Sequence, residues 1–381
     1  MRIALVHDAG SERGGIETYL DLVAAGLGQR GHTVWRADPR TALAARGGIA
    51  ADAASAPGEI DVVHVHRLED PEAITEIARR VPAVWSIHDH RPFCPGANRL
   101  RSDGSACVRA AGAPCALEGI LGRCSGLARW PRATVRRVSD WSRYRAALAS
   151  RAPCVVASAF MRDVAASQGH AARDLVVLPY PVVPPAEIGR TAADARGVLF
   201  AGRLVEPDKG LALLVDVLAR LPPTIRAVVA GGGSARRWLE ARLAEAALGA
   251  RVELVGWLDR DALAHRLSDA AVVVMTSAWP EPSGLVGLEA LAHGRPVVAT
   301  DVGGIGEWLA EGVVGHRVPP GDPVAMADRI RVLLGDPARR EAMGRAGRAW
   351  MLAHRSLAGH VRALEGLYAR VAHRTREARS A

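Results

Sequence analysis

Short apolar runs rich in β-branched residues alternate with helical patterns along the whole chain. The first series of predicted strands covers Ile3–Val6, Thr33–Trp35, Val62–Val65, Ala83–Ile87, Cys154–Ala157 and Leu175–Leu178. A second series covers Val198–Ala201, Ala227–Ala230, Val252–Val255, Ala271–Met275, Pro296–Ala299 and His316–Val318. Such alternation is typical of α/β proteins with parallel sheets. The two similar series predict two doubly wound, Rossmann-like domains that face each other across a central cleft.

A proline-rich stretch, residues 179–185, separates the two series, and no regular element can run through it. We therefore place an N-terminal domain at residues 1–183 and a C-terminal domain at residues 184–355. The remaining residues, 356–381, carry one apolar stripe at helical spacing. We expect this terminal helix to cross back and pack on the N-terminal domain.

Composition narrows the class of protein. Hydrophobic residues make up 49% and charged residues 23% of the 381 residues, which excludes general disorder. No apolar run approaches the roughly 18 residues of a membrane span, and no signal peptide is evident, so we expect a cytoplasmic protein. The net charge of +9 is consistent with an anionic partner but does not identify it.

A glycine-rich loop follows the first predicted strand and leads into a helical pattern near Ile16. Its last residues, Gly14 and Gly15, precede a helix N-terminus, whose N–H groups and dipole favour phosphate. The spacing matches neither a dinucleotide fingerprint nor a Walker loop. A tight turn that needs glycine explains the loop equally well, so both interpretations stand.

The second domain opens with a loop that holds two cations, Arg203 and Lys209, between Gly202 and a helix that starts at Leu211. A guanidinium fork and a point charge on one loop suit a pyrophosphate. Two solvated surface charges are the ordinary alternative. That alternative is weakened because Lys209 is the only lysine among 49 basic residues.

Two carboxylates, Glu281 and Glu289, flank the start of a later helix with seven residues between them. At about 1.5 Å rise per residue they lie on the order of 10 Å apart, comparable to the distance between the sugar and the ribose of a nucleotide sugar. Favourable placement of a carboxylate at a helix start explains Glu281 alone. The backbone N–H groups that would face the diphosphate belong to Ser283, Gly284, Leu285 and Val286.

These motifs resemble those of the retaining glycosyltransferases of family 4, which have the GT-B fold and use nucleotide-diphosphate sugars. The resemblance covers the whole chain and is more specific in the C-terminal half. It rests on Gly14-Gly15-Ile16-Glu17, on Gly202-Arg203 with Lys209-Gly210, on the Glu281 to Glu289 pattern, and on Pro296-Val297-Val298-Ala299-Thr300 running into Gly303-Gly304.

The resemblance implies a role for each donor-site residue. Gly15 would approach the donor phosphates, and Arg203 and Lys209 would neutralise the leaving diphosphate. Glu281 would bind hydroxyls of the donor sugar, and Glu289 would hold the ribose. The segment Ser283-Gly284-Leu285 would supply backbone contacts to phosphate or sugar.

His88, at the end of a predicted strand, matches the family histidine that faces the anomeric centre. The resemblance further implies retention of anomeric configuration by same-face attack, in which the leaving phosphate accepts the acceptor proton. No metal ion is then required. We interpret the one D-x-D pattern, residues 259–261, as a helix N-cap.

Two departures from the family pattern leave the donor's identity open. Ser283 stands where the family more often has an aromatic residue. The loop of Gly231, Gly232 and Gly233 lacks the acidic or polar middle residue often seen there, although it can still line the nucleotide. The acceptor, a small natural product or a polysaccharide or lipid-linked precursor, is also open.

Four cysteines lie in an insertion at residues 91–128, at spacings that contain no C-x2-C pair. A structural zinc, one or two disulfides and unpaired thiols all remain open for this set. Its members are Cys94, Cys107, Cys115 and Cys124.

An amphipathic helix is predicted from Trp130 to Ser150, with Val135, Val138, Trp141, Tyr144 and Leu148 on one side. Its arginines suit either a solvated face, which we favour, or contact with anionic lipid head groups or a phosphorylated acceptor. Aromatic residues are only 4%, so we expect no nucleic-acid partner.

Two other functions share parts of this pattern. A nucleotide-sugar 2-epimerase has the same fold class and would release free nucleotide without an acceptor. A non-catalytic two-domain protein would bind a small molecule reversibly, but it would not need cations and a carboxylate grouped at one site. We expect a glycosyltransferase in preference to either.

Overall fold

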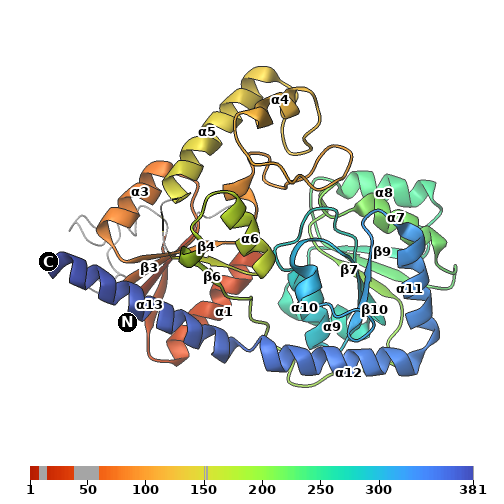
Figure 1. Ribbon diagram of the computed structural model, residues 1–381. Coiled ribbons are helices and arrows are strands. Elements are labelled where there is room, and N and C mark those ends of the chain that lie inside the picture. The colour runs from red at the N-terminus through yellow and green to blue at the C-terminus, as the bar shows by residue number, and fades with distance from the viewer. Residues whose placement is uncertain (8–14, 38–59, 150, 152, 381) are drawn as a thin grey trace. The chain divides into compact units, whose positions relative to one another are not determined.

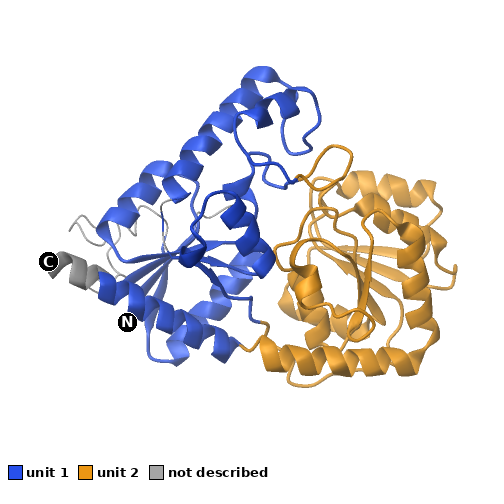
Figure 2. Cartoon of the chain, in the orientation of Figure 1, with its two compact units in different colours: residues 1–99, 108–181, 357–381 blue, residues 100–107, 182–356 orange. Residues whose placement is uncertain are grey.

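The computed structural model describes residues 1–7, 15–37, 60–149, 151 and 153–380 (Figure 1). The chain divides into two compact units, coloured separately in Figure 2. Unit 1 comprises residues 1–99, 108–181 and 357–381, and unit 2 comprises residues 100–107 and 182–356. The chain passes from unit 1 to unit 2 between Pro181 and Val182, within the predicted proline-rich linker, which contains no helix or strand in the structure.

Unit 1 is built on a parallel sheet. Among its described residues the sheet has six strands in the order β2-β1-β3-β4-β5-β6. Its elements are β1 (Arg2–His7), α1 (Gly15–Gln29), β2 (Thr33–Ala37), β3 (Val62–Arg67), α3 (Pro71–Arg80), β4 (Ala83–Ile87), η1 (Arg91–Phe93), α4 (Pro114–Ile120), α5 (Pro131–Ala149), β5 (Cys154–Val156), α6 (Ala159–Ser167), η2 (Ala172–Asp174), β6 (Leu175–Val177) and α13 (Leu357–Ser380).

Unit 2 contains a second parallel sheet, of six described strands in the order β12-β11-β10-β7-β8-β9. Its elements are β7 (Val198–Ala201), α7 (Leu211–Arg220), β8 (Ala227–Ala230), α8 (Arg236–Glu245), β9 (Val252–Gly256), α9 (Arg260–Asp269), β10 (Val272–Met275), α10 (Leu285–Ala292), β11 (Val297–Thr300), η3 (Gly303–Glu307), β12 (Gly315–Val318), α11 (Pro323–Gly335) and α12 (Pro337–His354).

Each strand of both predicted series is confirmed, with its ends shifted by at most two residues. The central strands are buried on both faces because helices cover both sides of a parallel sheet. This is why β10 appears in the sequence as a continuous apolar run, and β4 as one interrupted only by Ser86, rather than as alternating patterns. The doubly wound α/β class predicted from the sequence is thus present in both units.

The strand order of each unit reverses direction at one point. In unit 2 the chain moves outward from β7 to β8 and β9, and then returns to β10 on the other side of β7. In unit 1 the corresponding reversal lies between β1 and β3. Ligands of open α/β sheets bind outside the carboxyl ends of the strands at such a point. Ligands are therefore expected at the loops after β7 and β10 in unit 2 and after β1 and β3 in unit 1.

The terminal helix α13 belongs to unit 1, as the sequence predicted, and packs against α1 (Figure 1). Val361, Leu364 and Leu367 of its apolar stripe are buried. Two buried hydrogen bonds add to this packing: Tyr368 Oη lies 2.7 Å from His64 Nδ1, and His360 Nε2 lies 2.9 Å from Tyr19 Oη. Helix α13 is thus an integral part of the unit 1 core.

Candidate functional site

The strongest polar cluster of unit 2 is a buried ion pair between the loops that follow β7 and β10. Lys209 Nζ lies 2.5 Å from Glu281 Oε1 and 5.0 Å from the centre of the Trp279 ring. Ser277 Oγ donates a second hydrogen bond to the same carboxylate oxygen, also at 2.5 Å. Burial would raise the pKa of Glu281, but the Lys209 charge and the surrounding hydrogen bonds outweigh it and hold that pKa below its usual value. The carboxylate therefore stays ionised at neutral pH.

Contacts of Thr276 with Lys209 and Gly210 hold the two loops together. Thr276 Oγ1 donates a hydrogen bond of 2.8 Å to the carbonyl oxygen of Lys209. The next residue, Gly210, has φ of +59°, and a Cβ added to it would lie 2.0 Å from the carbonyl oxygen of Thr276. Glycine is required here because the two backbones touch.

A third loop, after β11, fixes the Glu281 backbone. The amide of Gly304 donates a hydrogen bond of 2.7 Å to the carbonyl oxygen of Glu281. Gly303 has φ of +60°, and a Cβ there would lie 2.2 Å from that same oxygen. Thr300 Oγ1 donates to the carbonyl oxygen of Ser277 at 2.6 Å. The Gly303-Gly304 pair noted in the sequence therefore fixes the backbone position of Glu281.

The glycine loops after β7 and β8 lie against each other. A Cβ on Gly231 would lie 1.8 Å from the carbonyl oxygen of Gly202, whereas a Cβ on Gly232 would meet no atom within 4 Å. The amide of Leu204 donates to the carbonyl oxygen of Gly232 at 2.7 Å. Gly233 is also constrained, since a Cβ there would lie 2.4 Å from the carbonyl oxygen of Leu204. Packing therefore requires glycine at the first and third positions of this loop, whereas the middle one faces open space.

Arg203, next to these glycines, is exposed, and its guanidinium forms no hydrogen bond or ion pair within the described ranges. Glu206, which the sequence analysis missed, accepts a hydrogen bond of 2.6 Å from the amide of Leu211 and so caps the N-terminus of α7. Burial raises the pKa of this carboxyl group. Because Glu206 is engaged in this cap, the Arg203 guanidinium remains available to bind an anion.

Helix α10 begins as predicted, after Gly284, whose φ is +73°. The amides of Leu285 and Val286 donate no hydrogen bond within the described part of the chain, as expected for the first turn of a helix. Glu289 is half-buried on the same helix, and burial raises its pKa to about 7 against a smaller opposing effect of Arg260. Trp308 Nε1 donates to the carbonyl oxygen of Ser283 at 2.7 Å and orders the turn.

His88, in unit 1, lies at the carboxyl end of β4 within a network of buried rings. Its Nδ1 lies 2.6 Å from Tyr180 Oη, and its Nε2 lies 3.1 Å from His66 Nδ1. The Tyr19 ring makes edge contacts with the rings of His66, His88 and Tyr180. Both ring nitrogens of His88 thus have partners within unit 1.

Burial makes this network electrically neutral. It lowers the pKa of His88 to about 4, with a smaller opposing effect of Asp89. It lowers the pKa of His66 well below the usual value, and neighbouring histidines add to that shift. His66 Nε2 is buried without a hydrogen-bond partner in the described structure. At neutral pH these imidazoles are uncharged hydrogen-bonding groups.

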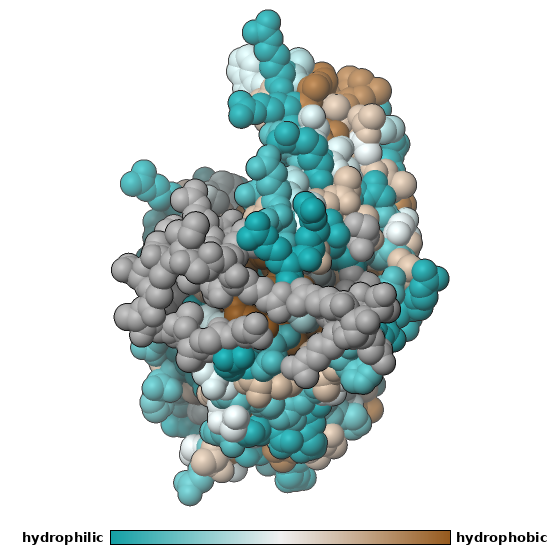
Figure 3. Space-filling model, turned by 90° about the vertical axis from the view of Figure 1, so that its left-hand side faces the viewer, coloured by the Kyte–Doolittle hydropathy of each residue, from teal (hydrophilic) through white to brown (hydrophobic). Residues whose placement is uncertain are grey.

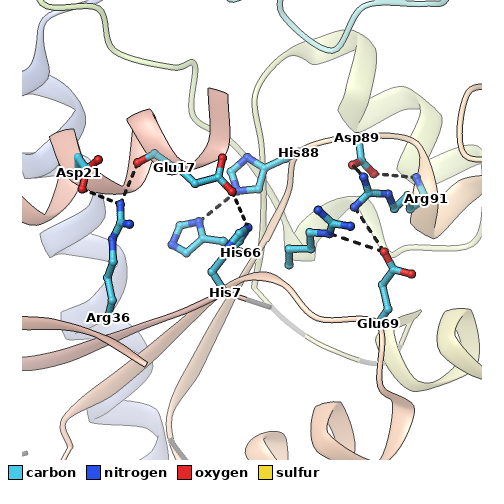
Figure 4. Close-up of polar contacts among 10 residues, drawn as sticks. His7, Glu17, Asp21, Arg36, His66, Glu69, His88, Asp89 and Arg91 are labelled. Atoms are coloured by element: carbon cyan, nitrogen blue, oxygen red, sulfur yellow. Dashed lines mark hydrogen bonds and ion pairs between the residues drawn. The ribbon is translucent and has the colours of Figure 1, made fainter. Parts of the chain in front are cut away.

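Charged side chains border the network at the ends of β3 and β4 (Figure 4). Arg91 lies 3.3 Å from Glu69 and 3.5 Å from Asp89, and Arg67 lies 3.7 Å from Glu69. Together with His66 and His88, these four residues line one pocket of unit 1. Two cations and two anions leave its edge without a dominant charge.

The structure brings some predicted site residues together and leaves others apart. Lys209 and Glu281 are in direct contact, and Gly202 and Gly232 lie in adjoining loops. Gly15 is the first residue of α1, while Gly14 lies outside the described residues. The sequence analysis missed His66, Tyr180 and Ser277. His64 and His66 alternate along β3, and this pattern could have shown that two histidines share one face of the strand.

The prediction that Asp259 caps a helix is confirmed, because its carboxylate accepts a hydrogen bond of 2.8 Å from the amide of Ala262. Within the described residues no group of three or more His, Cys, Asp or Glu side chains is arranged to hold a metal ion. No disulfide bond joins the cysteines of the described chain. Of the insertion's cysteines, Cys94 is buried, and Cys107, Cys115 and Cys124 are partly exposed. No helix among the described residues has the length and apolarity needed to cross a membrane.

Comparison with known proteins identifies relatives of both the sequence and the fold. Residues 187–350 match the family model described as glycosyl transferases group 1. A D-inositol 3-phosphate glycosyltransferase of Xylanimonas cellulosilytica is 39% identical over 184 residues, which are 44% of this chain and 43% of that protein. The chain thus spans less than half of that relative's length.

Two further relatives match over most of the chain. An alpha-maltose-1-phosphate synthase of Mycobacterium tuberculosis is 29% identical over 363 residues, which cover 86% of this chain and 85% of that protein. Among solved structures, HepE of Anabaena in complex with UDP and glucose has a TM-score of 0.68 and 18% identity, and the match covers 97% of this chain and 99% of that one. This structural likeness shows the GT-B fold.

Proposed function

Because the chain carries the glycosyl transferases group 1 domain at residues 187–350, we propose that it transfers a sugar from a nucleotide-diphosphate donor to an acceptor hydroxyl. The observation that carries the proposal is the Lys209–Glu281 pair at the strand-order reversal of unit 2, with the unpaired Arg203 on the same loop as Lys209. A sugar diphosphate needs cations for its phosphates and a carboxylate for its hydroxyls. This loop region contains both.

The donor roles follow from the chemistry of each group. Arg203 and Lys209 neutralise the diphosphate, and the free amides at the start of α10 add hydrogen bonds to it. Glu281, kept ionised by Lys209, accepts hydrogen bonds from sugar hydroxyls. Glu289 accepts hydrogen bonds from the ribose, and the open side of Gly232 leaves room for the nucleotide. HepE, whose structure contains UDP and glucose, supports a donor of this class.

The rate of transfer depends on stabilising the leaving diphosphate as the sugar becomes oxocarbenium-like. Removing one group aimed at developing charge typically costs about 3–4 kcal/mol of barrier. We propose that the reaction retains anomeric configuration by same-face attack, with the leaving phosphate accepting the acceptor proton. This assignment to family 4 rests on the resemblance of the motifs.

His88 is our candidate in unit 1 for contact with the transferred sugar. Its low pKa, about 4, means that it acts as a neutral hydrogen-bonding group rather than as an acid. A sugar hydroxyl that binds His88 would replace either Tyr180 or His66 as its partner. Unit 1 would also select the acceptor, whose chemical class we leave open.

The decisive experiment measures binding and turnover of a panel of nucleotide-diphosphate sugars by the native chain, Lys209→Ala and Glu281→Ala. Nucleoside diphosphate release is followed with and without candidate acceptors. We expect saturable binding that both substitutions weaken, and release that depends on the acceptor. Glu240→Ala, on exposed α8, is the matched control for removal of a carboxylate and leaves binding unchanged.

Other outcomes would select the alternatives. Acceptor-independent release of nucleotide, together with epimerised sugar, would identify a 2-epimerase. Binding of the donor without any turnover would favour a non-catalytic binding protein. If no nucleotide sugar binds, or if neither substitution changes binding, the assignment of the donor site to unit 2 is wrong. The anomeric configuration of the product, read by NMR, tests retention separately.

A further inference from the structure

The helical hairpin of α4 and α5 exposes an unusual amount of apolar surface. Among the described residues twelve large apolar side chains are exposed, and five of them lie between residues 108 and 135. Their exposed fractions range from 51% to 88%. We name these five the apolar tip: Val108, Leu117, Leu121, Trp130 and Val135. So many exposed apolar side chains in one segment of a folded chain indicate an interaction site.

The way in which α4 packs on α5 explains this exposure. Helix α4 docks on α5 through Gly119, where an added Cβ would lie 2.8 Å from Thr134 Cγ2 and 2.9 Å from Leu127 Cβ. Leu117 and Leu121 are one turn apart on the opposite side of α4, so docking directs both outward. The closeness of the Gly119 contact leaves α4 no room to turn its leucines inward.

Helix α5 buries one side along its length, with Thr134 and Val138 buried in its N-terminal half. Trp141 and Leu148, in its C-terminal half, are buried, and Trp141 Nε1 donates a hydrogen bond of 2.8 Å to the carbonyl oxygen of Arg91. The sequence analysis placed Val135 on the same packed side, and this is wrong, because Val135 is exposed. On its turn of the helix the neighbouring Thr134 is the buried residue and packs against Gly119 of α4 (Figure 1), which leaves Val135 on the exposed side.

Arginines surround the apolar tip. Between Val108 and Ala149 the chain has eight arginines, one aspartate and one glutamate, so this segment carries most of the net charge of +9. Arg132 and Arg136 line one shallow hollow together with Val135. Glu118 is paired with Arg109 at 3.1 Å, and Asp140 lies within 4 Å of two further arginines. Figure 3 shows apolar and hydrophilic residues side by side at the top of the molecule.

From this juxtaposition we propose that the apolar tip and its arginines bind the surface of an anionic lipid bilayer. Charge complementarity selects this occupant: the arginines attract acidic head groups, while Trp130, Leu117 and Leu121 enter the boundary between head groups and acyl chains. Tryptophan favours that boundary because its ring is apolar and its N–H is polar. The proposal concerns peripheral contact and is independent of the transfer reaction.

Vesicle sedimentation tests the proposal with the full chain. Phosphatidylcholine vesicles with and without phosphatidylglycerol are compared at low and high salt. We expect binding only when phosphatidylglycerol is present, and loss of binding at high salt. Arg132→Gln with Arg136→Gln should weaken partitioning by about fivefold for each arginine removed. Trp130→Ala with Leu121→Ala should weaken it by at least about tenfold.

Controls separate surface binding from damage to the fold. Trp238→Ala, on α8 of unit 2, removes another partly exposed tryptophan and should sediment like the native chain. Trp130→Phe should keep most of the binding. All of these positions are exposed, so circular dichroism melting should be unchanged.

Two results would overturn the proposal. One is binding that neither phosphatidylglycerol nor the substitutions alter. The other is sedimentation without vesicles that the Trp130→Ala/Leu121→Ala variant abolishes, because this would assign the apolar tip to contact with a second copy of the chain.

Discussion

The polar clusters around Glu281 and around His88 are both buried, but the first keeps its charges and the second is neutral. In unit 2 a carboxylate stays charged because Lys209 lies 2.5 Å from it. In unit 1 the imidazoles of His66 and His88 lose their charge, since burial lowers their pKa and the nearest hydrogen-bonding groups are neutral. A buried charge needs a partner, whereas a buried neutral group needs only hydrogen bonds.

Under the proposed function, the two clusters have different roles. A fixed charge pair is suited to a highly charged diphosphate, which must be bound and then stabilised as it leaves. A neutral network is suited to uncharged hydroxyl groups, whose hydrogen bonds it can match. The comparison also predicts that the two clusters respond differently to substitution and to pH.

The largest effect should come from breaking the ion pair. Lys209→Met leaves the Glu281 carboxylate buried without its cation, which should cost about 3–5 kcal/mol of unfolding free energy. Turnover should fall about 100- to 1000-fold as well, since the same cation stabilises the leaving group. Urea unfolding and initial rates measure the two losses.

The double variant Lys209→Met/Glu281→Met provides the control. It should recover much of the stability without recovering turnover, because both charges are gone. A Lys209→Met protein with native stability and native turnover would show that the pair has neither role.

The next largest effect should come from the neutral network. His88→Ala should lower turnover about 100-fold while changing donor affinity much less, because the contacts proposed for the diphosphate and the ribose lie in unit 2 and His88 contacts only the sugar. Isothermal titration with the donor and a steady-state rate assay separate the two quantities. His265→Ala, an exposed histidine of α9, is the matched control. A loss of donor affinity equal to the loss of rate would contradict this division of roles.

A smaller effect distinguishes the first two of the three glycines in the loop after β8. Gly231→Ala should destabilise the protein by about 1–3 kcal/mol, because its Cβ would overlap the carbonyl oxygen of Gly202 at 1.8 Å. Gly232→Ala should change stability by less than about 0.5 kcal/mol, yet weaken donor binding if the nucleotide occupies the open side. Thermal unfolding and donor titration test both. Equal destabilisation by the two substitutions would argue against a glycine exposed to ligand.

The smallest effect should be a pH dependence of stability and of donor affinity, caused by Glu289 of unit 2. Burial raises the folded-state pKa of Glu289 from 4.5 to about 7, so the folded state holds this proton more tightly than the unfolded state. Its stabilising contribution is therefore present below pH 4.5 and is lost as the pH rises toward 7. Donor affinity should change in the other direction, since the ribose hydroxyls prefer the carboxylate.

Donor affinity should accordingly be about tenfold weaker at pH 6 than at pH 8. Glu289→Gln should remove this dependence. His88, with a pKa of about 4, should contribute none of it over that range. A dependence that survives in Glu289→Gln would place the titrating group elsewhere.

Much of the proposed donor site could be predicted from the sequence, through the motifs that resemble those of family 4. Gly202, Arg203, Lys209 and Glu281 all lie in loops that directly follow predicted strands, and parallel strands bring such loops to one edge of a sheet. The unit 1 network could not be recognised in the same way. Tyr180 and His88 are 92 residues apart in sequence, and no local pattern connects them.

The sequence by itself determined the strands and the doubly wound class, because these depend on local periodicity. The return of the terminal helix to unit 1 was predicted and is confirmed. The residues of the proposed donor site follow from the motifs that resemble family 4. Only the tertiary structure decided which groups are charged and which face solvent. Packing desolvates His88 and Glu289, Lys209 keeps Glu281 ionised, and the docking of α4 on Thr134 leaves the adjacent Val135 exposed. Burial and partner distance depend on contacts between remote segments, and these set the electrostatics of the site.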